Sequence, residues 1–352
     1  MMKVLFVFYV PGGGVETLNR QRWKALKKAG ITSHFLYMRE GSGMKNVKNM
    51  TVFITNHNQR IKDILTKHQY DAVVICSDHT FIQRLKSMGY KGKIIYEIQG
   101  LGGYKQARRW LTNARSILLH HADAMMFPET PHIVQLTKTI LPEKKTFIFN
   151  NCLDTESFTY RPLPPPKCPV ISWVGRLEKN KNWRYFLRIC KGLIQKQRDM
   201  KIWMFIDDQL SPEKEDFLKM IKGLKLQSNL TLYTNIPHEQ MPDYYSMTGD
   251  SGGFLCSTSL SEGSPYCVQE AMSCKCPVLA TDSDGVQIFI THNVTGKLVP
   301  DDKPLHAIQE GQELLTNQTL RKKIITRAHR LVQTKFSLDQ YGRQFKMMLK
   351  QL

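Results

Sequence analysis

The sequence has no long apolar segment and no cysteine pattern typical of a metal site. None of its hydrophobic runs reaches the roughly 18 residues that a membrane-spanning helix needs. The eight cysteines form no C-x2-C pair, and several, such as Cys76, lie inside apolar runs. We therefore expect buried, reduced thiols rather than disulfides or metal ligands. The opening MMKVLFVFYVPGGG is too short and too poorly flanked for a signal peptide, so we expect a cytoplasmic protein.

Acidic residues are scarce relative to basic ones. The chain has 30 Asp and Glu against 50 Lys and Arg, a net charge of +20, and the excess is larger in the first 160 residues than in the rest. Such a field attracts nucleotides, anionic lipids, acidic polymers or nucleic acid. Because the sequence lacks an aromatic-basic RNA motif and a recognition-helix pattern, we expect no nucleic-acid partner. It also lacks G-x-G-x-x-G, which argues against a nicotinamide-dependent oxidoreductase.

Apolar runs and helical stretches alternate along the first part of the chain. The run KVLFVFYV (3–10) is rich in valine and aromatics, which suits a strand buried on both faces of a parallel sheet. A glycine loop follows, and then a helical stretch that begins near residue 16 and ends at Gly30. Further strands are expected at ITSHFLYM, TVFIT, DAVVIC, KIIYEI, ADAMMF and KTFIFNN, with helices near 58–68, 79–88, 104–121 and 130–140. This alternation predicts a doubly wound parallel sheet.

Five prolines crowd residues 161–169, and the alternation restarts after them. Proline removes a backbone donor and stiffens the chain, so we interpret this stretch as a linker. Beyond it we expect strands at PVISWVG, KIWMFI, LTLYT, GGFLCS and CPVLAT, helices at 182–197, 211–223, 239–247, 265–274 and 304–315, and a helical tail. The predicted fold class is α/β, with two Rossmann-like domains facing each other across a cleft, because ligands bind beyond the carboxyl ends of parallel strands.

The segment 254–300 has the strongest site pattern. Glu262 follows a predicted strand, Ser264 is a good N-cap and Pro265 a good first helical residue, and Glu270 lies further along that helix. The N–H groups from Gly263 onward and the positive helix end suit an anionic diphosphate or a sugar oxygen. By spacing alone, both glutamates are equally well explained as ordinary polar residues.

Two other loops follow predicted first strands of the domains. In WVGRLEKNKN (173–182), Arg176 and Lys181 could neutralise the charge of a departing diphosphate, although a solvated basic turn has the same composition. In the loop at residues 11–16, Gly13 and Gly14 allow the backbone to approach a ligand closely, and Glu16 follows them. This second motif is weak by itself.

Taken together, these segments resemble glycosyltransferase family 4, a family of retaining enzymes with the GT-B fold. The resemblance is carried by GGGVE, VGRLEKNKN, the two glutamates within SEGSPYCVQEAM, and CPVLATDSDGVQ followed by TGKLVP. It covers nearly the whole chain and is most specific in the second half. It implies an acceptor-binding domain at residues 1–163, a donor-binding domain at 164–336, and a helix at 337–352 that crosses back to the first domain.

The resemblance also implies roles for individual residues. Arg176 and Lys181 would hold the donor diphosphate, Glu270 would bind the nucleotide ribose, and Glu262 with Gly263 and Ser264 would meet the donor sugar. Gly13 and Gly14 would lie near the diphosphate and the acceptor. The expected catalytic group is Arg176, Lys181 and Glu262, without a metal or other cofactor, because the two cations replace the metal and the nucleotide sugar is a substrate.

Three positions depart from the family pattern. Gln99 stands where the family often has a histidine, and an amide can bind a sugar hydroxyl but is neither an acid nor a base. Gln287 stands where a glutamate is usual, and residues 207–209 (Asp-Asp-Gln) replace a G-x-G turn. These changes favour an unusual acceptor or a degenerate enzyme.

The stretch 104–121 predicts a basic amphipathic helix. Lys105, Arg108, Arg109 and Arg115 fall near one side of it, and apolar residues fall on another. Such a helix can lie on an anionic membrane or hold an acidic polymer, or it can simply pack on the sheet. With Glu16 and Gln99, we treat Lys105, Arg108 and Arg109 as acceptor-side candidates. Peripheral contact with the inner face of the membrane is one consequence.

The function predicted from the sequence is a retaining glycosyltransferase that moves a sugar from a nucleotide sugar, by family habit a UDP-sugar, to an acceptor hydroxyl. The expected acceptor is a glycan, a glycolipid or an anionic polymer in cell-envelope polysaccharide, teichoic-acid or glycolipid synthesis. The alternatives are a non-catalytic nucleotide-sugar-binding protein of the same fold and a nucleotide-sugar epimerase.

Overall fold

The computed structural model describes residues 2–207 and 211–352, and these residues form two compact units. The first unit comprises residues 1–154 and 335–352, and the second comprises residues 155–334. The predicted division at residue 163 therefore falls nine residues too late. The reason is that residues 155–163 bind the second unit: the Phe158 carbonyl accepts from Ser273 Oγ, and Arg161 Nη1 lies 2.7 Å from Asp243 Oδ1.

Among the described residues, the first unit holds a seven-stranded sheet in the order β3-β2-β1-β4-β5-β6-β7, and each pairing is parallel. Its strands are β1 (Lys3–Phe8), β2 (Thr32–Tyr37), β3 (Thr51–Ile54), β4 (Ala72–Cys76), β5 (Lys93–Glu97), β6 (Ala124–Phe127) and β7 (Thr146–Ile148). Its helices are α1 (Gly13–Lys28), α2 (Asn58–His68), α3 (Thr80–Ser87), α4 (Tyr104–His121), α5 (Pro131–Ile140) and α12 (Leu338–Gln351). The predicted doubly wound parallel sheet is confirmed here.

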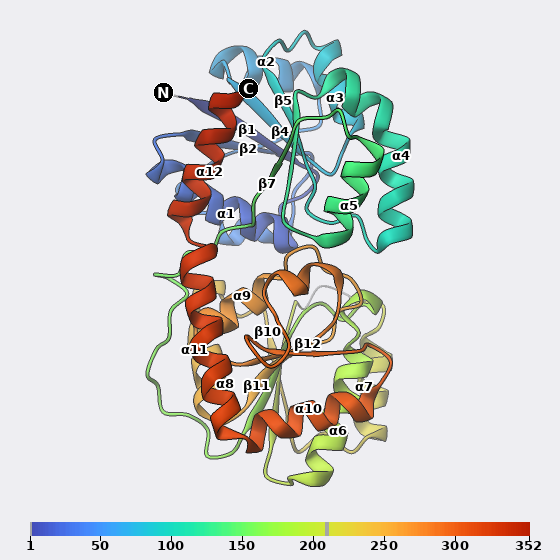
Figure 1. Ribbon diagram of the computed structural model, residues 1–352, viewed down its shortest axis with the longest axis vertical. Coiled ribbons are helices and arrows are strands. Elements are labelled where there is room, and N and C mark those ends of the chain that lie inside the picture. The colour runs from blue at the N-terminus through green and yellow to red at the C-terminus, as the bar shows by residue number, and fades with distance from the viewer. Residues whose placement is uncertain (1, 208–210) are drawn as a thin grey trace. The chain divides into compact units, whose positions relative to one another are not determined.

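Helices cover both faces of this sheet. Side chains of α2, α3, α4 and α5 join one buried apolar cluster, and side chains of α1 and α12 join the other. The C-terminal helix α12 lies beside α1 (Figure 1). The contact is close because Gly342 has no side chain, and a Cβ there would lie 2.8 Å from the Ala25 carbonyl oxygen. Phe345 reaches the sheet, with its ring centroid 5.7 Å from that of Phe6.

The second unit repeats the architecture. Its described residues form a six-stranded parallel sheet in the order β10-β9-β8-β11-β12-β13. Its strands are β8 (Val170–Val174), β9 (Lys201–Ile206), β10 (Leu230–Thr234), β11 (Phe254–Ser257), β12 (Val278–Thr281) and β13 (Lys297–Val299). Its helices are α6 (Trp183–Lys196), α7 (Lys214–Gly223), α8 (Met241–Asp250), α9 (Tyr266–Ser273), α10 (Pro304–Thr316) and α11 (Gln318–Lys335), the last of which ends at the boundary of the unit.

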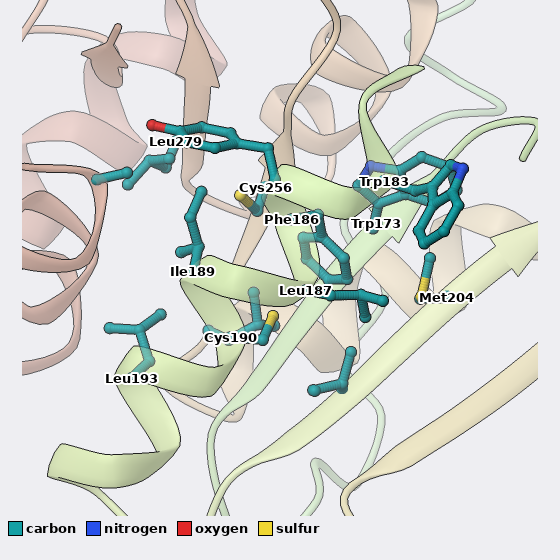
Figure 2. Packing of buried hydrophobic residues seen from close by; sticks show 14 of the residues in the cluster. Trp173, Trp183, Phe186, Leu187, Ile189, Cys190, Leu193, Met204, Cys256 and Leu279 are labelled. Atoms are coloured by element: carbon teal, nitrogen blue, oxygen red, sulfur yellow. The ribbon is translucent and has the colours of Figure 1, made fainter. Parts of the chain in front are cut away.

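A dense aromatic core lies between α6 and this sheet. Trp173 of β8, and Trp183 and Phe186 of α6, are each 1% exposed or less, and Figure 2 shows their rings near Met204 of β9. The inward face of α6 continues with Leu187, Ile189, Cys190 and Leu193 in the same view. This core fixes the ends of β8 and α6, and the segment between them carries Arg176 and Lys181.

Two expectations about local structure need correction. The helix α11 was not predicted as an element. The helix α1 begins at Gly13 rather than near residue 16, so Gly13 and Gly14 form its first turn instead of a preceding loop. Gly13 has φ +62°, a conformation that favours glycine.

The eight cysteines are free, and six of them are buried. In the described parts of the chain, no helix is both long and apolar enough to cross a lipid bilayer.

Candidate functional site

The carboxyl edge of the second sheet brings two distant loops together. Strands β8 and β11 are neighbours and run parallel, so the segments that follow them start at the same edge. The Leu260 N–H donates to the Asn180 carbonyl at 2.8 Å, and Asn180 Nδ2 donates to the Ser261 carbonyl at 3.1 Å. Thr258 Oγ1 also donates to the Lys181 carbonyl at 3.0 Å. These bonds hold the 3-10 helix at Lys179–Lys181 against the loop that carries Glu262.

Lys181 and Glu262 form an ion pair at this edge. Lys181 Nζ donates to Glu262 Oε1, and the two side chains are 21% and 15% exposed. Burial lowers the pKa of the Lys181 ammonium group, but the charge and hydrogen bond of Glu262, together with Cys267 and Glu178, have the larger combined effect, so the pKa is raised. Lys181 is therefore charged at neutral pH. Both residues were predicted site residues, and the structure brings them into contact although 81 positions separate them in the sequence.

Arg176 lies at the same end of β8 but in a more open position. Its guanidinium is 64% exposed, and its Nη2 lies 3.0 Å from Glu178 Oε1. The short turn is held by the Gly175 N–H, which donates to the Phe205 carbonyl at 3.0 Å. A Cβ on Gly175 would lie 2.8 Å from the Trp173 ring, so glycine is required between the core and the loop. Arg176 is thus a solvent-facing cation on a fixed turn.

Glu270 has two protein partners that the sequence analysis did not identify. Its Oε1 lies 2.8 Å from His238 Nε2, and its Oε2 accepts from the Tyr245 hydroxyl at 3.0 Å. Glu270 is 3% exposed and Tyr245 is 1% exposed. Burial, reinforced by the Glu270 carboxylate, raises the pKa of the Tyr245 hydroxyl well above its usual value, so that hydroxyl remains a donor.

The start of α9 differs from its prediction. The helix begins at Tyr266 with Pro265 at the N-cap position, and Ser264 Oγ accepts from Gln269 Nε2 at 3.3 Å instead of capping the helix. The cause is local backbone geometry: Pro265 has ψ 113°, which is extended, so the helix begins one residue later. Proline also has no N–H to offer a ligand.

Gly263 is held by close backbone packing. The Gly285 N–H donates to the Glu262 carbonyl at 2.7 Å, and a Cβ on Gly285 would lie only 1.8 Å from the Gly263 carbonyl oxygen. Ser261 Oγ adds a 2.9 Å hydrogen bond to Asp284 Oδ2. The loop that carries Glu262 is therefore fixed from two sides. Gln287, which stands where the family usually has a glutamate, is exposed, and its Nε2 donates to Asp282 Oδ1 at 2.8 Å. Asp208 and Gln209, which belong to the segment in place of the G-x-G turn, lie outside the described residues.

In the first unit, Gly13 and Gly14 are exposed and a Cβ on either would have no neighbour within 4 Å. Glu16 is different: it is 3% exposed, and its Oε1 lies 2.6 Å from Arg20 Nε. The exposed glycines leave room for a ligand, and the glutamate is already engaged within its own helix.

Gln99 belongs to a buried polar network. Its Nε2 donates to Glu97 Oε1 at 2.7 Å and to Asn151 Oδ1 at 3.1 Å, and its Oε1 accepts from Asn151 Nδ2 at 2.7 Å. Glu97 in turn forms a two-point ion pair with Arg22, at 2.6 and 2.9 Å, with both side chains 1% exposed. Because both amide hydrogens are used, Gln99 retains one acceptor position and can only accept from a sugar hydroxyl.

The predicted basic helix is α4, and it packs on the sheet as well as presenting a charged face. Ala107, Leu111, Ala114 and Leu118 are buried, which confirms the apolar stripe. Lys105, Arg108 and Arg109 are exposed on the opposite side.

Within residues 2–207 and 211–352, His, Cys, Asp and Glu side chains form no group of three or more that could hold a metal ion.

Solved structures identify the fold. The crystal structure of Anabaena HepE in complex with UDP and glucose matches with a TM-score of 0.83 and 15% identity, over 100% of both chains. The structure of an S. aureus TarM mutant with Fondaparinux, alpha-GlcNAc-glycerol and UDP matches with a TM-score of 0.79 and 11% identity, over 99% of this chain and 100% of that one. Two such Rossmann-like units are the architecture of GT-B glycosyltransferases, which confirms the predicted fold.

The second unit identifies the family. Residues 156–331 match the model of glycosyl transferases group 1, and the chain belongs to that family. Among curated relatives, alpha-D-kanosaminyltransferase of Streptomyces kanamyceticus is 26% identical over 50% of this chain and 44% of its own length. A Campylobacter jejuni enzyme named as an N-acetylgalactosaminyltransferase acting on a diacetylbacillosaminyl-diphospho-undecaprenol is 26% identical over 64% of this chain and 60% of its own. The chain thus spans about half the length of these relatives.

Proposed function

We propose that the chain is a retaining glycosyltransferase that moves a sugar from a UDP-sugar to an acceptor hydroxyl. The observation that carries the proposal is the Lys181–Glu262 ion pair at the carboxyl edge of the second sheet. It lies inside the segment that matches the family model. Crystal structures of the same fold with UDP and with UDP-glucose support the choice of nucleotide.

Four side chains would bind the donor in the proposed site. Lys181 and Arg176 would neutralise the diphosphate as it departs, which is electrostatic stabilisation without a metal. Glu262 would accept hydrogen bonds from sugar hydroxyls, and the backbone N–H groups of Gly263 and Ser264 would donate to sugar oxygens. Glu270 would accept from the hydroxyls of the nucleotide ribose. In this proposal the departing phosphate takes the proton of the acceptor hydroxyl on the same face of the sugar, and no protein nucleophile takes part.

The proposed acceptor is an anionic glycolipid or envelope polymer. Its support is the exposed row of Lys105, Arg108 and Arg109 on α4, since cations of this kind attract anionic lipids and polymers. The names of two relatives include a lipid: the Campylobacter jejuni enzyme and the yeast phosphatidylinositol N-acetylglucosaminyltransferase subunit. Peripheral contact of the first unit with an anionic membrane follows from the same row.

A thermal-shift screen tests the donor site. Wild type and the variants Arg176→Ala and Glu270→Ala are heated with UDP-, GDP-, ADP- and dTDP-sugars. A ligand at 100 times its dissociation constant adds about 2.7 kcal/mol of stability. The proposal expects UDP-sugars to stabilise wild type and both substitutions to weaken that effect. Failure of every nucleotide sugar to stabilise the folded wild type would contradict it.

Product analysis separates transfer from the competing activities. Incubation with the stabilising nucleotide sugar and envelope lipid extract is expected to yield free nucleoside diphosphate and a glycosylated acceptor whose anomeric configuration matches the donor. An altered nucleotide sugar formed without any acceptor would indicate an epimerase. Binding without turnover under any acceptor would indicate a non-catalytic protein.

Sedimentation with lipid vesicles tests the membrane contact. Vesicles of phosphatidylcholine with phosphatidylglycerol are expected to bind the protein, and pure phosphatidylcholine vesicles are expected to bind it weakly. Replacement of Lys105, Arg108 and Arg109 by Gln should abolish the difference. The matched control replaces three exposed lysines elsewhere on the first unit, Lys62, Lys67 and Lys91, and removes the same charge. Equal loss in both triple variants would contradict a specific role for α4.

A further inference from the structure

The carboxylate of Glu270 is held at both oxygens by side chains from the segment that precedes it in the unit. His238, in the 3-10 helix His238–Gln240, meets Oε1 at 2.8 Å, and Tyr245, on α8, donates to Oε2 at 3.0 Å. Neither contact is local, since 32 and 25 positions separate the partners. Two independent donors from two elements therefore converge on one carboxylate.

The two donors differ in their surroundings. Tyr245 is 1% exposed and lies inside the unit, so its hydroxyl is a permanent partner of Oε2. The His238 side chain is 20% exposed, and its ring rests on Phe158 with the centroids 4.6 Å apart. Of the two donors to the buried Glu270 carboxylate, His238 is therefore the one that solvent reaches. The imidazole presents its Nε2–H to the carboxylate in this arrangement, because a carboxylate oxygen only accepts.

The remaining hydrogen-bonding capacity of Glu270 matches a pair of hydroxyls. A carboxylate has about four acceptor positions, two on each oxygen. One position on each oxygen is taken, so one on each is left. A ribose carries two neighbouring hydroxyl groups, each with one O–H to donate, and two such donors fit one remaining position on each oxygen.

We propose that His238 and Tyr245 are positioning residues that orient the Glu270 carboxylate toward the two hydroxyls of the donor ribose. This inference rests on the proposed function, in which Glu270 binds that ribose. Without these donors the carboxylate can rotate about its last side-chain bond, and the ribose loses its oriented partner. The effect should then fall on hydroxyl recognition and not on binding of the diphosphate.

The test compares UDP with 2′-deoxy-UDP by isothermal titration on the full chain, with the ADP and GDP pairs beside them. A hydrogen bond to a charged group is worth about a tenfold difference in affinity or more. Wild type is expected to prefer UDP over 2′-deoxy-UDP by about this factor. Glu270→Gln, Tyr245→Phe and His238→Ala should each reduce the preference to about twofold or less, mainly by weakening UDP.

Two further variants make the result specific. His238→Gln keeps an N–H donor near the position of the imidazole Nε2 and should restore much of the preference that His238→Ala loses. Tyr244→Phe removes the hydroxyl next to Tyr245, from a ring that packs among Trp203, Phe205 and Tyr233, and should leave the preference unchanged. Circular dichroism and a melting curve establish that each variant is folded.

The titration distinguishes failure of the proposed function from failure of this inference. If wild type binds none of the nucleoside diphosphates, the proposed function fails and this inference fails with it. If wild type discriminates between ribose and deoxyribose and the His238 and Tyr245 variants keep the same ratio, this inference alone is overturned. Equal weakening of both ligands in those variants would indicate a purely structural role and would also overturn it.

Discussion

Each unit pairs a glutamate with a cation, but the two pairs have different surroundings. Arg22 and Glu97 in the first unit are 1% exposed each and bind through two hydrogen bonds. Lys181 and Glu262 in the second unit are 21% and 15% exposed and lie at the carboxyl edge of the sheet, Lys181 in a 3-10 helix and Glu262 in a loop. A pair that is buried in the core is not accessible to a ligand, whereas a pair that reaches solvent is. The difference in exposure supports a structural role for the first pair and the proposed donor-binding role for the second.

The largest expected effect on stability is at the sealed pair. Arg22→Met leaves the Glu97 carboxylate buried without its cation and should lower the free energy of unfolding by about 3–5 kcal/mol. Lys93→Met is the control, since its pair with Asp123 is 48% and 31% exposed and should contribute less than about 1 kcal/mol. Denaturant unfolding measures both. Equal losses in the two variants would contradict the distinction between a sealed and an open pair.

The open pair should affect function more than folding. Lys181→Met removes a cation from the proposed diphosphate site and should lower the transfer rate by about 100-fold. Its cost in stability should be clearly smaller than that of Arg22→Met. Lys179→Met, an exposed lysine in the same 3-10 helix, is the matched control and should keep full activity. The binding role is refuted if both lysine variants transfer sugar at the wild-type rate.

Glycine substitutions compare the surroundings of Glu262 in the second unit with the first turn of α1 in the first. Gly285→Ala places a Cβ 1.8 Å from the Gly263 carbonyl oxygen and should cost about 1–3 kcal/mol as the loop of Glu262 shifts, with loss of nucleotide binding. Gly14→Ala meets nothing within 4 Å and should change stability by no more than about 1 kcal/mol, in the stabilising direction. Melting curves with and without nucleotide measure both effects. A larger loss for Gly14→Ala would reverse the comparison.

The smallest expected effect is a pH dependence confined to the first unit. Burial lowers the pKa of His34 to about 4, with His68 and Lys3 adding repulsion, and its Nδ1 lies 2.8 Å from the Tyr70 hydroxyl. The unfolded chain takes up a proton near pH 6.5 and the folded chain does not, so stability falls as the pH drops from 6.5 toward 4. The loss should be on the order of 1 kcal/mol between pH 7 and 5.5.

His34→Gln is the control for that pH dependence. An uncharged amide has no proton to take up in this range, so the stability of the variant should vary less over the same interval. Urea unfolding at several pH values measures the difference. A variant whose stability falls as steeply as that of wild type would remove His34 as the cause.

Most of the fold could be predicted from the sequence because each buried parallel strand is a continuous apolar run, as in β1 and β4. The helix α11 was missed for a physical reason. Its buried stripe includes Arg321, whose guanidinium is 5% exposed and donates to the Gly249 and Gly253 carbonyls at 2.6 and 2.7 Å. An arginine at an inward position breaks the apolar pattern on which the prediction depends.

The site could be predicted only in part. Lys181, Glu262 and Glu270 were named because their local sequence matches a family pattern. His238 and Tyr245 were missed because nothing near them in the sequence indicates a carboxylate 32 or 25 positions away. The start of α9 was misplaced because serine and proline suit the first positions of a helix, whereas the extended Pro265 delays its onset.

Hydrogen–deuterium exchange with and without UDP tests whether the second unit carries the donor site. We expect slower exchange in peptides that cover residues 176–182 and 260–270, and loss of the protection of 260–270 in Lys181→Met. Protection confined to the first unit, or no protection in either segment at a saturating concentration of UDP, would contradict a donor site in the second unit.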